Sequence, residues 1–260
     1  MPPQQPLRDN INRVNKYNYV GASVFIGLRA ADVFLQHALL QRGWASDLIE
    51  SIGGTAVNRA TIIDASTTML QPYYGLISLM AFGSSFKQIA NMIFVMEQDL
   101  SPTSAVVIAL FNTAFNSFNT LLSVWAATSQ VPTSSSPDAL KSPWLILAAG
   151  SYFVGIVTEL ASEWQRKRFK QDPANKGKPY AGGLFSLARH INYGGYTIWR
   201  AAYAFTAGGW PWGLAVFSWF FYDFAARGVP VLDAYMLDRY GEDWKAIKAR
   251  VPSVLIPGIY

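Results

Sequence analysis

The chain has 260 residues, of which 51% are hydrophobic and only 14% are charged, and it contains no cysteine. Soluble domains carry about 25% charged residues, so this composition argues against an ordinary soluble domain. The lack of cysteine excludes disulfides, thiolate nucleophiles and cysteine-ligated metals, and only two histidines remain for a zinc site. We therefore expect no metal site.

Long uncharged stretches, taken in chain order, predict a polytopic membrane protein. A helix rises about 1.5 Å per residue, so about 20 apolar residues cross the roughly 30 Å hydrocarbon core of a bilayer. The expected fold is all-α, one membrane domain with about six to seven transmembrane helices, a basic cytoplasmic loop and a C-terminal tail. The six spans that fit best are residues 18–41, 68–96, 101–128, 143–163, 185–207 and 210–232.

Two polar segments are expected outside the membrane. Residues 1–10 lack the basic-then-apolar pattern of a removable signal peptide, so the first span itself is expected to direct the chain to the membrane. Residues 131–143 are rich in proline and serine, which predicts a turn-rich loop.

The distribution of charge predicts an orientation. Residues 164–183 carry six cations and one acid, whereas residues 42–66 carry two cations and three acids. Cytoplasmic loops are enriched in lysine and arginine. We therefore expect the basic loop and both termini on the cytoplasmic face. The endoplasmic reticulum is the expected membrane, with a bacterial inner membrane as the alternative.

Ionisable side chains inside the predicted spans are candidates for function, because they are costly in lipid unless they are paired or face a wet cavity. Arg29 and Asp32, three residues apart in the first span, are expected to pair with each other. Lys87 in the second span either faces a cavity or extends to the interface. Glu159 and Glu163 share a helix face, so cations or a ligand hydroxyl are expected beside them.

Residues 159–200 carry the densest set of motifs: a hydrophobic helix, a basic loop and the start of a second hydrophobic helix. Cations and free backbone N–H groups suit a polyanion such as a dinucleotide pyrophosphate. The run FKQDPANKG (169–177), the pairs Arg189-His190 and Asn192-Tyr193, and the closing segment 238–260 resemble the steroid 5-alpha-reductase and sterol reductase superfamily. The resemblance covers about residues 150–260, and isoprenylcysteine carboxyl methyltransferases are related to the same superfamily.

This resemblance implies an NADPH-dependent membrane reductase that saturates a carbon–carbon double bond, often beside a carbonyl, in a sterol-like or isoprenoid lipid. Residues 1–142 would shape the pocket for the lipophilic substrate, and residues 143–260 would hold the cofactor. The expected partners are this small molecule and membrane lipids, not nucleic acid, and no oligomeric state is predicted.

The resemblance also implies a set of cofactor-binding residues. They would hold the adenosine ribose and its phosphate, order the basic loop, face the pyrophosphate or nicotinamide ribose, and close over the adenosine. Asn192 is the central candidate, with Gly194-Gly195 expected to let a ligand approach the backbone and a helix cap as the alternative role. The set is Glu159, Glu163, Arg166, Lys170, Asn175, Lys176, Arg189, His190, Asn192, Asp233, Tyr235 and Tyr240.

Reduction of an enone needs a group that polarises the carbonyl or donates a proton. Tyr193 is the candidate proton donor or orienting hydroxyl, and an interfacial tyrosine is the alternative reading. Glu97, which has a competing role as a helix cap, and Tyr196 complete the catalytic candidates. Further expected substrate contacts are Tyr73, Tyr74 and Lys87.

Departures from the superfamily pattern keep two other functions open. Tyr196 stands where many relatives have an acid that binds the nicotinamide amide, Arg200 stands where tryptophan is common, and Ile191 replaces a proline. One alternative is an S-adenosylmethionine-dependent lipid methyltransferase, since those relatives share an Arg-His-Pro-x-Tyr-x-Gly motif. The other is a non-redox isomerase or cyclase that uses Glu97, Glu159 or Tyr196 as acid–base groups.

Overall fold

The computed structural model describes residues 7, 9, 16–65, 67–130 and 140–260. The regular elements in these ranges are helices, and two isolated bridges, Ala56–Trp125 and Ile63–Leu70, form no strand. Most of the expected polar segments 1–10 and 131–143 lies outside the described residues. The elements are α1 (Tyr19–Gln41), α2 (Trp44–Ser51), α3 (Arg59–Ile62), α4 (Pro72–Phe94), α5 (Pro102–Val124), α6 (Pro143–Gln171), η2 (Pro173–Asn175), η3 (Gly183–Ser186), α7 (Ile191–Asp223), η4 (Phe224–Gly228), α8 (Val229–Tyr240) and α9 (Glu242–Arg250).

Local sequence decides where the long helices begin. α4, α5 and α6 start with Pro72, Pro102 and Pro143. Proline fits the first turn because its φ suits the helix and its missing N–H has no intrahelical partner there. Ser101 also caps α5, because its Oγ accepts a hydrogen bond from the backbone N–H of Ser104 at 3.1 Å.

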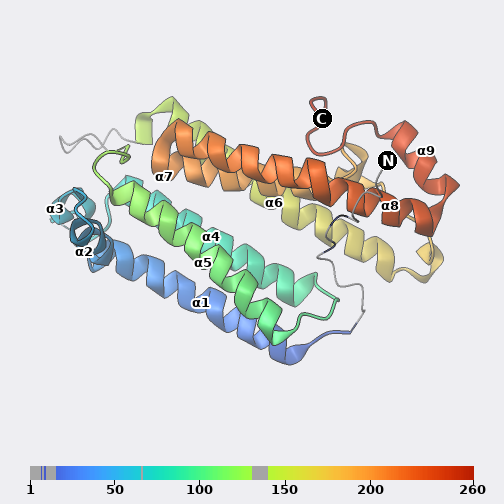
Figure 1. The fold of residues 1–260 in the computed structure, drawn as a ribbon, viewed down its shortest axis with the longest axis horizontal. Helices are drawn as coiled ribbons and strands as arrows, with labels where there is room; N and C mark the ends of the chain where they lie inside the picture. The colour runs from blue at the N-terminus through green and yellow to red at the C-terminus, as the bar shows by residue number, and fades with distance from the viewer. Residues whose placement is uncertain (1–6, 8, 10–15, 66, 131–139) are drawn as a thin grey trace, which may run out of the picture.

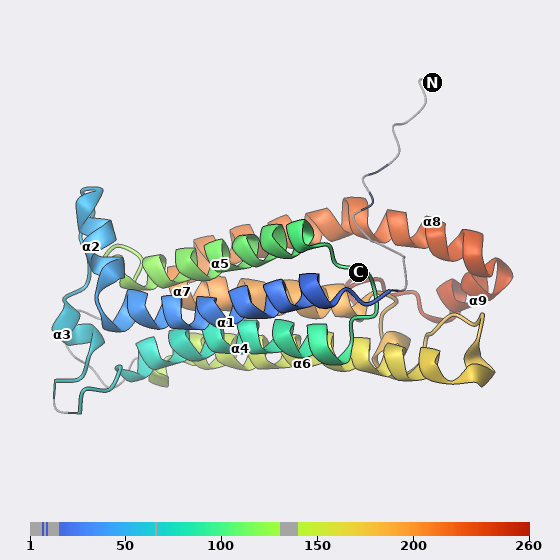
Figure 2. The same ribbon diagram turned by 90° about the horizontal axis from the view of Figure 1, so that it is seen from below.

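The long helices form an elongated bundle whose axes follow the longest dimension of the molecule (Figures 1 and 2). α1 packs against α4 and α5, and α6 packs along α7. Among the described helices, three are long and apolar enough to cross a membrane: α1, α5 and α6. Large apolar side chains such as Phe34, Leu79 and Phe153 are exposed on the outside of the bundle, as contact with lipid requires.

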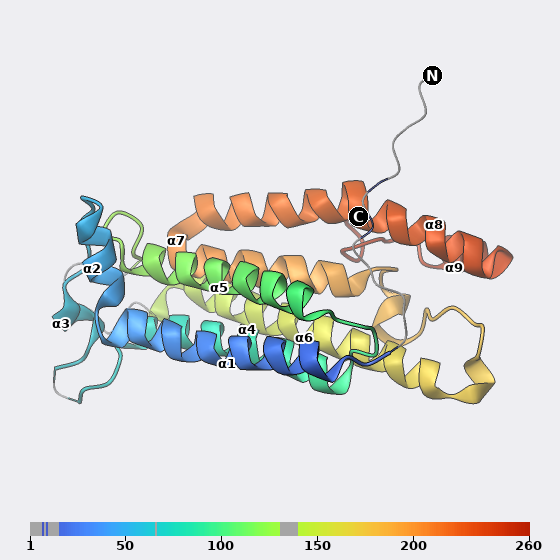
Figure 3. The same cartoon turned by 60° about the horizontal axis from the view of Figure 1, so that its bottom comes forward.

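α7 consists of two arms joined by a sharp reversal. Gly208 has non-helical dihedral angles, and Gly209 has φ 72° and ψ −172°, a conformation that residues with a Cβ rarely adopt. Gly213 packs against Phe205 and Ala201. The second arm therefore runs back along the first, as Figure 3 shows. The predicted span 185–207 corresponds to the first arm, and the span 210–232 starts in the second arm and continues through η4 into α8.

The bundle has two different ends. The start of α1, the end of α4, the start of α5, the end of α6 and the start of α7 lie at one end with α8, α9 and the C-terminus (Figure 3). The other end carries α2, α3 and the reversal in α7. The described segments that we expect on the cytoplasmic face are therefore grouped at a single end.

The basic segment is more helical than its sequence predicts. The span expected to end at residue 163 continues as α6 to Gln171, so the cations from Arg166 to Lys170 occupy helical turns rather than a loop. Arginine, lysine and glutamine are good helix formers. The helix ends only at Asp172, whose side chain accepts the N–H of Ala174 at 2.9 Å ahead of a proline-containing turn.

α6 and the first arm of α7 approach each other backbone to backbone. A Cβ added at Gly155 would lie 2.7 Å from the nitrogen of Trp199 and 2.8 Å from the carbonyl oxygen of Gly195. Small residues permit this close approach between membrane helices. The contact sets Glu159, one turn along α6, directly beside Trp199 of α7.

A buried polar network joins α1, α4 and α5. Arg29 and Asp32 pair at 3.1 Å with fully buried side chains, which confirms their expected pairing. Arg29 also donates to Ser85 Oγ at 2.7 Å, and Asn116 Nδ2 donates to Asp32 Oδ2 at 2.7 Å. Because buried charges are tolerated when they are paired and hydrogen-bonded, this network explains both residues as structural.

Candidate functional site

The outer cluster, which we define as Glu163, Arg166, Asn192 and Tyr193, lies where α6 ends and α7 begins. Asn192 Nδ2 donates to Glu163 Oε1 at 2.6 Å. Arg166 pairs with the other oxygen of the same carboxylate. A single carboxylate therefore joins an amide on α7 to a cation on α6, and the side chain of Asn192 does not cap the helix.

Aromatic rings stack beside the outer cluster. Tyr193 lies face to face with Phe224, with ring centroids 4.3 Å apart, and parallel to His190 at 5.9 Å. Trp244 of α9 meets the edge of His190 at 6.4 Å. The reversal in α7 is what brings Phe224, from η4, back to Tyr193.

His190 lies immediately before α7 and is 5% exposed. Its backbone N–H donates to the carbonyl of Val254 at 2.8 Å. Its Nε2 is buried and has no hydrogen-bond partner among the described residues. Burial, reinforced by the positive charge of Arg189, lowers the pKa of His190 to about 4. The ring is therefore neutral near pH 7 and keeps an unused nitrogen.

The inner cluster, which we define as Lys87, Glu159 and Trp199, lies one helical turn further into the bundle. Glu159 pairs with Lys87 of α4. Trp199 Nε1 donates to Glu159 Oε2 at 2.7 Å. α6 thus supplies Glu159 to the inner cluster and Glu163 to the outer one, and each carboxylate has the cation that the sequence led us to expect.

Arg200 lies inside a cage of aromatic rings next to the inner cluster. Its nitrogen Nη2 donates to Asn112 Oδ1. The negative faces of aromatic rings attract a cation. No carboxylate forms an ion pair with Arg200 among the residues that the structure describes, so the cage holds a net positive charge within the bundle. The guanidinium lies 4.4 Å from the ring centroid of Trp199, 5.1 Å from Tyr196, 5.4 Å from Phe115 and 5.9 Å from Phe220.

The inner cavity, of about 300 Å³, adjoins the inner cluster. Tyr196 lines it and also meets Phe224 edge-on at 5.7 Å, so one lining residue contacts the ring stack beside the outer cluster. Its polar wall is formed by Lys87, Gln88, Asn91, Asn112 and Tyr196. Its apolar wall is formed by Phe25, Met92, Met96, Leu100, Ile108 and Phe111.

The glycines after Asn192 make room for protein rather than for a ligand. A Cβ added at Gly194 would lie 2.0 Å from the carbonyl oxygen of Leu255, and one at Gly195 would lie 2.8 Å from that of Gly155. This corrects the expectation that the glycine pair lets a ligand approach the backbone. The pair instead lets the C-terminal segment and α6 pack on opposite sides of α7.

Arg189 fastens the C-terminal segment to the start of α7. Its Nη1 donates to the carbonyls of Val251 at 2.6 Å and Pro252 at 3.0 Å. Its backbone N–H donates to the carbonyl of Ser253 at 3.0 Å. The structure therefore places Arg189 against the chain's own carbonyls, where the resemblance had implied a pyrophosphate.

Asp233 of α8 holds α9 in place. It accepts hydrogen bonds from Trp244 Nε1 at 2.8 Å and from Lys248 Nζ at 2.6 Å. Partial burial opposes ionisation of Asp233, but these two donors outweigh it and lower its pKa. Trp244 in turn contacts His190, so Asp233 acts on the outer cluster through α9 rather than by direct contact.

Two cations flank Tyr240 at the end of α8. Lys170 Nζ donates to the hydroxyl of Tyr240 at 2.6 Å. Arg239 lies over the rings of Tyr235 and Tyr240 and donates to the hydroxyl of Tyr235 at 2.7 Å. The structure thus groups three of the expected cofactor residues, Lys170, Tyr235 and Tyr240, around Arg239 and the end of α8.

Tyr73 and Tyr74 lie at the wrong end of the bundle for the substrate role that we expected. They begin α4, about 20 Å from Lys87 along the helix axis. Tyr73 donates to the carbonyl of Thr206 at 2.9 Å, and both tyrosines belong to the hydrophobic core. Four helical turns therefore separate them from the candidate site.

Three further candidates lie at the right end but outside the inner cavity. Glu97 pairs with Lys167 of α6 at 3.4 Å, and its side chain is 43% exposed. Asn175 donates to the carbonyl of Phe169 at 3.2 Å and so orders the turn after α6. Lys176 is exposed in that turn.

Sequence reasoning missed the amides of the cavity wall, Gln88, Asn91 and Asn112. A signal was present, because α5 carries Asn112, Asn116 and Asn119 in an otherwise apolar span. Polar side chains inside a membrane helix mark either a packing partner or a pathway for a ligand. The aromatic cage around Arg200 depends on α5 and on both arms of α7, and it had no comparable signal in the sequence.

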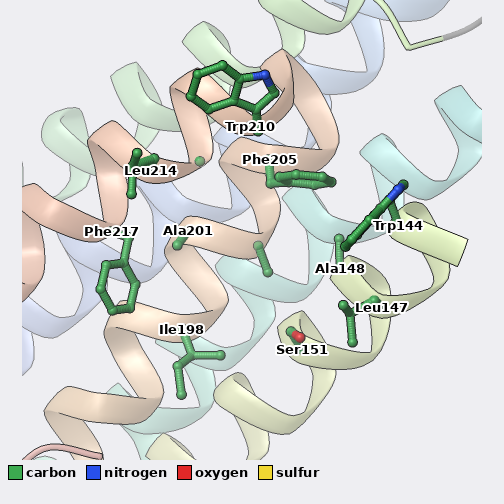
Figure 4. A pocket seen from close by; sticks show the side chains of 12 residues that line it. Trp144, Leu147, Ala148, Ser151, Ile198, Ala201, Phe205, Trp210, Leu214 and Phe217 are labelled. Carbon is green, nitrogen blue, oxygen red and sulfur yellow. The ribbon is translucent and has the colours of Figure 1, made fainter. Parts of the chain in front are cut away.

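A second cavity, of about 500 Å³, lies between α6 and the two arms of α7 (Figure 4). Its lining is almost entirely apolar, with Trp144, Phe205 and Leu214 among the labelled side chains and Ser151 as a polar exception. Residues of the outer and inner clusters do not line it. It therefore offers contact with lipid and no reactive group.

Comparison with known proteins places this arrangement in a family. The chain is 35% identical over 238 residues to the probable O-methyltransferase ustE of Ustilaginoidea virens, and the match covers 89% of this chain and 84% of the relative. Residues 84–251, which include both clusters, match the family described as protein of unknown function (DUF1295), a family associated with steroid 5-alpha-reductase-like proteins. The chain belongs to the DUF1295 family.

Proposed function

We propose that this protein is a membrane enzyme that transfers a methyl group from S-adenosylmethionine to an oxygen atom of a lipophilic acceptor. The similarity to a probable O-methyltransferase along most of the chain supports this choice. In this proposal α4 and both arms of α7 cross the membrane together with α1, α5 and α6. The end that carries α8 and α9 faces the cytoplasm, where the cofactor is available.

The observation that carries the proposal is the position of Arg200 beside Tyr196. Reductases of the superfamily that the chain resembles have an acid at the position of Tyr196, whereas here a caged cation lies 5.1 Å from the tyrosine ring. Hydride transfer from NADPH creates positive charge on the nicotinamide, which a nearby buried cation opposes. Transfer of a methyl group from a sulfonium removes positive charge, which the same cation favours.

The outer cluster fits the adenosine part of S-adenosylmethionine. The carboxylate of Glu163 and the amide of Asn192 can bind ribose hydroxyls, and the stacked rings of Tyr193 and Phe224 offer a flat apolar surface to a purine. The unused Nε2 of His190 can bind a polar group of the ligand. When bound, this cofactor would supply an activated methyl group.

The inner cluster provides a base and a cation for the acceptor oxygen. Methylation converts R–OH into R–O–CH3 and releases one proton, so the oxygen must lose its hydrogen as the new bond forms. Glu159, which pairs with the cavity residue Lys87, can take that proton, while Lys87 stabilises the developing negative charge on oxygen. The low polarity of the bundle strengthens both effects.

NADPH-dependent reduction remains the second candidate. Lys170 and Arg239 flank Tyr240, which is an arrangement suited to a nucleotide phosphate. Against this function, Arg189 already donates to backbone carbonyls, and the nicotinamide-side acid of the reductases is replaced by Tyr196. The geometry therefore favours methyl transfer.

The direct test is calorimetric titration of the purified protein in detergent with S-adenosylmethionine, NADPH and NADH in parallel. We expect S-adenosylmethionine to bind and the two nicotinamide cofactors to bind much more weakly. Glu163→Gln should weaken S-adenosylmethionine, whereas the exposed control Glu242→Gln should not. Tight binding of NADPH without binding of S-adenosylmethionine would reject the proposal in favour of the reductase.

A further inference from the structure

The hydrogen-bond network around Arg200 determines how one side chain of the inner cavity is oriented. A guanidinium can only donate hydrogen bonds, so Asn112 must present its carbonyl oxygen to Arg200. The amide nitrogen of Asn112 donates instead to the carbonyl of Ile108 at 2.7 Å. The orientation of Asn112 is therefore set by its neighbours and not by any ligand.

Gln88 is oriented by the same network. Its Nε2 donates to Asn112 Oδ1 at 2.6 Å. Because Asn112 can offer only an acceptor at this position, Gln88 must use its nitrogen here and turn its own oxygen elsewhere. That oxygen, Gln88 Oε1, is buried and accepts no hydrogen bond from the described residues.

Asn91 provides a second acceptor in the same wall. Its Oδ1 is likewise buried and without a hydrogen-bond partner in the described part of the chain. Asn91 follows Lys87 by one helical turn, and Lys87, Gln88 and Asn91 all line the cavity. A buried acceptor that is left unpaired is destabilising, so a cavity lined by two such side chains favours a ligand that donates hydrogen bonds.

The size and the apolar lining of the cavity limit the shape of this ligand. A volume of about 300 Å³ lies at the lower end of the range for small-molecule sites, which is about 300–1,000 Å³. Aromatic and methionine side chains such as Phe25, Met92 and Phe111 form the apolar wall. Ring edges and thioether sulfur pack well on the face of an aromatic compound.

We infer that the acceptor is a compact aromatic compound with at least three hydroxyl groups, two of which donate hydrogen bonds to Gln88 and Asn91 while the oxygen of the third lies at Lys87 and loses its proton. This inference rests on the proposed methyl transfer. It replaces the sterol-like or isoprenoid lipid that the family resemblance implies with a smaller and more polar molecule. Gln88 and Asn91 determine specificity, because each accepts a hydrogen bond that a fully methylated compound cannot donate.

Binding of 1,3-dihydroxynaphthalene and of its dimethyl ether to the full chain in detergent tests the inference. We expect the diol to bind the parent protein at least about tenfold more tightly than the ether, since each of the two unpaired buried acceptors is worth about that much. Gln88→Leu should reduce this preference, and Gln88→Glu, which keeps an acceptor, should retain it. Gln98→Leu, at an exposed position after α4, is the matched control and should change neither affinity.

If Gln88→Leu fails to fold, the same binding measurement can be made on Asn91→Leu. That variant should also show a reduced preference for the diol. Equal binding of diol and ether by the parent protein would overturn the inference, as would an unchanged preference in both leucine variants. Titration with S-adenosylmethionine is scored separately. Cofactor binding without any preference for the diol rejects only the inference, whereas a Gln88-dependent preference without cofactor binding rejects only the proposed function.

Discussion

Asn192 and Glu163 are joined by a 2.6 Å hydrogen bond that ties the first turn of α7 to the last turns of α6. Arg166 occupies the other oxygen of Glu163, so the carboxylate is held from both sides. Asn192 is also 8% exposed and is followed by glycines that pack against protein. The side-chain amide of Asn192 therefore faces Glu163 of the outer cluster.

Asn192→Ala should weaken binding of S-adenosylmethionine by about twofold to tenfold, because it removes an amide that binds a ribose hydroxyl in the proposed complex, and a neutral hydrogen bond is worth about 0.5–1.5 kcal/mol. The melting temperature in detergent should stay close to that of the parent, since Arg166 still pairs with Glu163. Calorimetric titration and thermal unfolding measure the two effects.

Asn175→Ala is the matched control for that prediction. Asn175 donates to a backbone carbonyl in the turn after α6 and touches neither cluster. Loss of the Asn175 side chain should leave the affinity for S-adenosylmethionine unchanged. A variant at position 192 that unfolds more easily yet binds normally would identify Asn192 as a structural residue.

Gly155→Ala should destabilise the protein, because the new methyl group would lie 2.7 Å from the backbone of Trp199 and force α6 away from α7. Overpacking of this kind costs about 1–3 kcal/mol. Separation of the helices should also break the hydrogen bond from Trp199 to Glu159, with a visible change in tryptophan fluorescence.

Gly150→Ala, on the same helix, is the control for Gly155→Ala. A Cβ at Gly150 meets nothing within 4 Å. Alanine also favours helix over glycine by about 1 kcal/mol, so this variant should be as stable as the parent or more stable. Equal melting temperatures for the two alanine variants would show that α6 and α7 are not in close contact.

His190 should make stability depend on pH in the acidic range. Its pKa is lowered from 6.5 to about 4 in the folded protein. Below pH 6.5 the unfolded chain therefore binds a proton that the folded chain does not, so stability falls as the pH drops from 6.5 to 4. Each pKa unit corresponds to about 1.4 kcal/mol, which limits the effect to about 3 kcal/mol.

His190→Gln removes the titrating group from this equilibrium. The melting temperature of the variant in detergent should vary less between pH 4 and pH 6.5 than that of the parent, while the two proteins keep a constant difference above pH 7. An identical acid dependence in both proteins would assign the loss of stability to other groups.

Single cysteines can test the orientation, because the chain has no cysteine of its own. Lys176→Cys and Lys245→Cys, both exposed at the end with α8 and α9, should react with an impermeant thiol reagent from the cytoplasmic side. Ser51→Cys, at the exposed end of α2, should react only from the opposite side. Labelling of positions 176 and 51 from the same side would contradict the orientation.

Much of the fold was predictable because its causes are local. Runs of apolar residues decided where the long helices lie, and Pro72, Pro102 and Pro143 mark their first turns. The pairing of Arg29 with Asp32 followed from a spacing of three residues on one helix. The extension of α6 was missed because the charge of residues 164–171 suggested a loop, although their helix propensity is high.

The motifs in residues 159–200 also indicated Glu163 and Asn192 as site candidates from the sequence. Their contact across α6 and α7 depends on the close approach at Gly155, which no periodicity reveals. Arg189 shows the opposite outcome: its motif suggested a phosphate, but the folded C-terminal segment supplies its partners. A motif identifies a residue type at a position, and packing decides what that residue touches.

The sequence by itself indicated the membrane character, the first turns of α4, α5 and α6 and the residues at the head of α7. Only the tertiary structure decided that Lys87 meets Glu159 across 72 residues and that Arg200 meets Asn112 across 88. Hydropathy and capping act over a few residues, whereas these contacts depend on how helices rotate and approach one another. The inner cavity and its two unpaired acceptors exist only because those rotations place Gln88 and Asn91 inside the bundle.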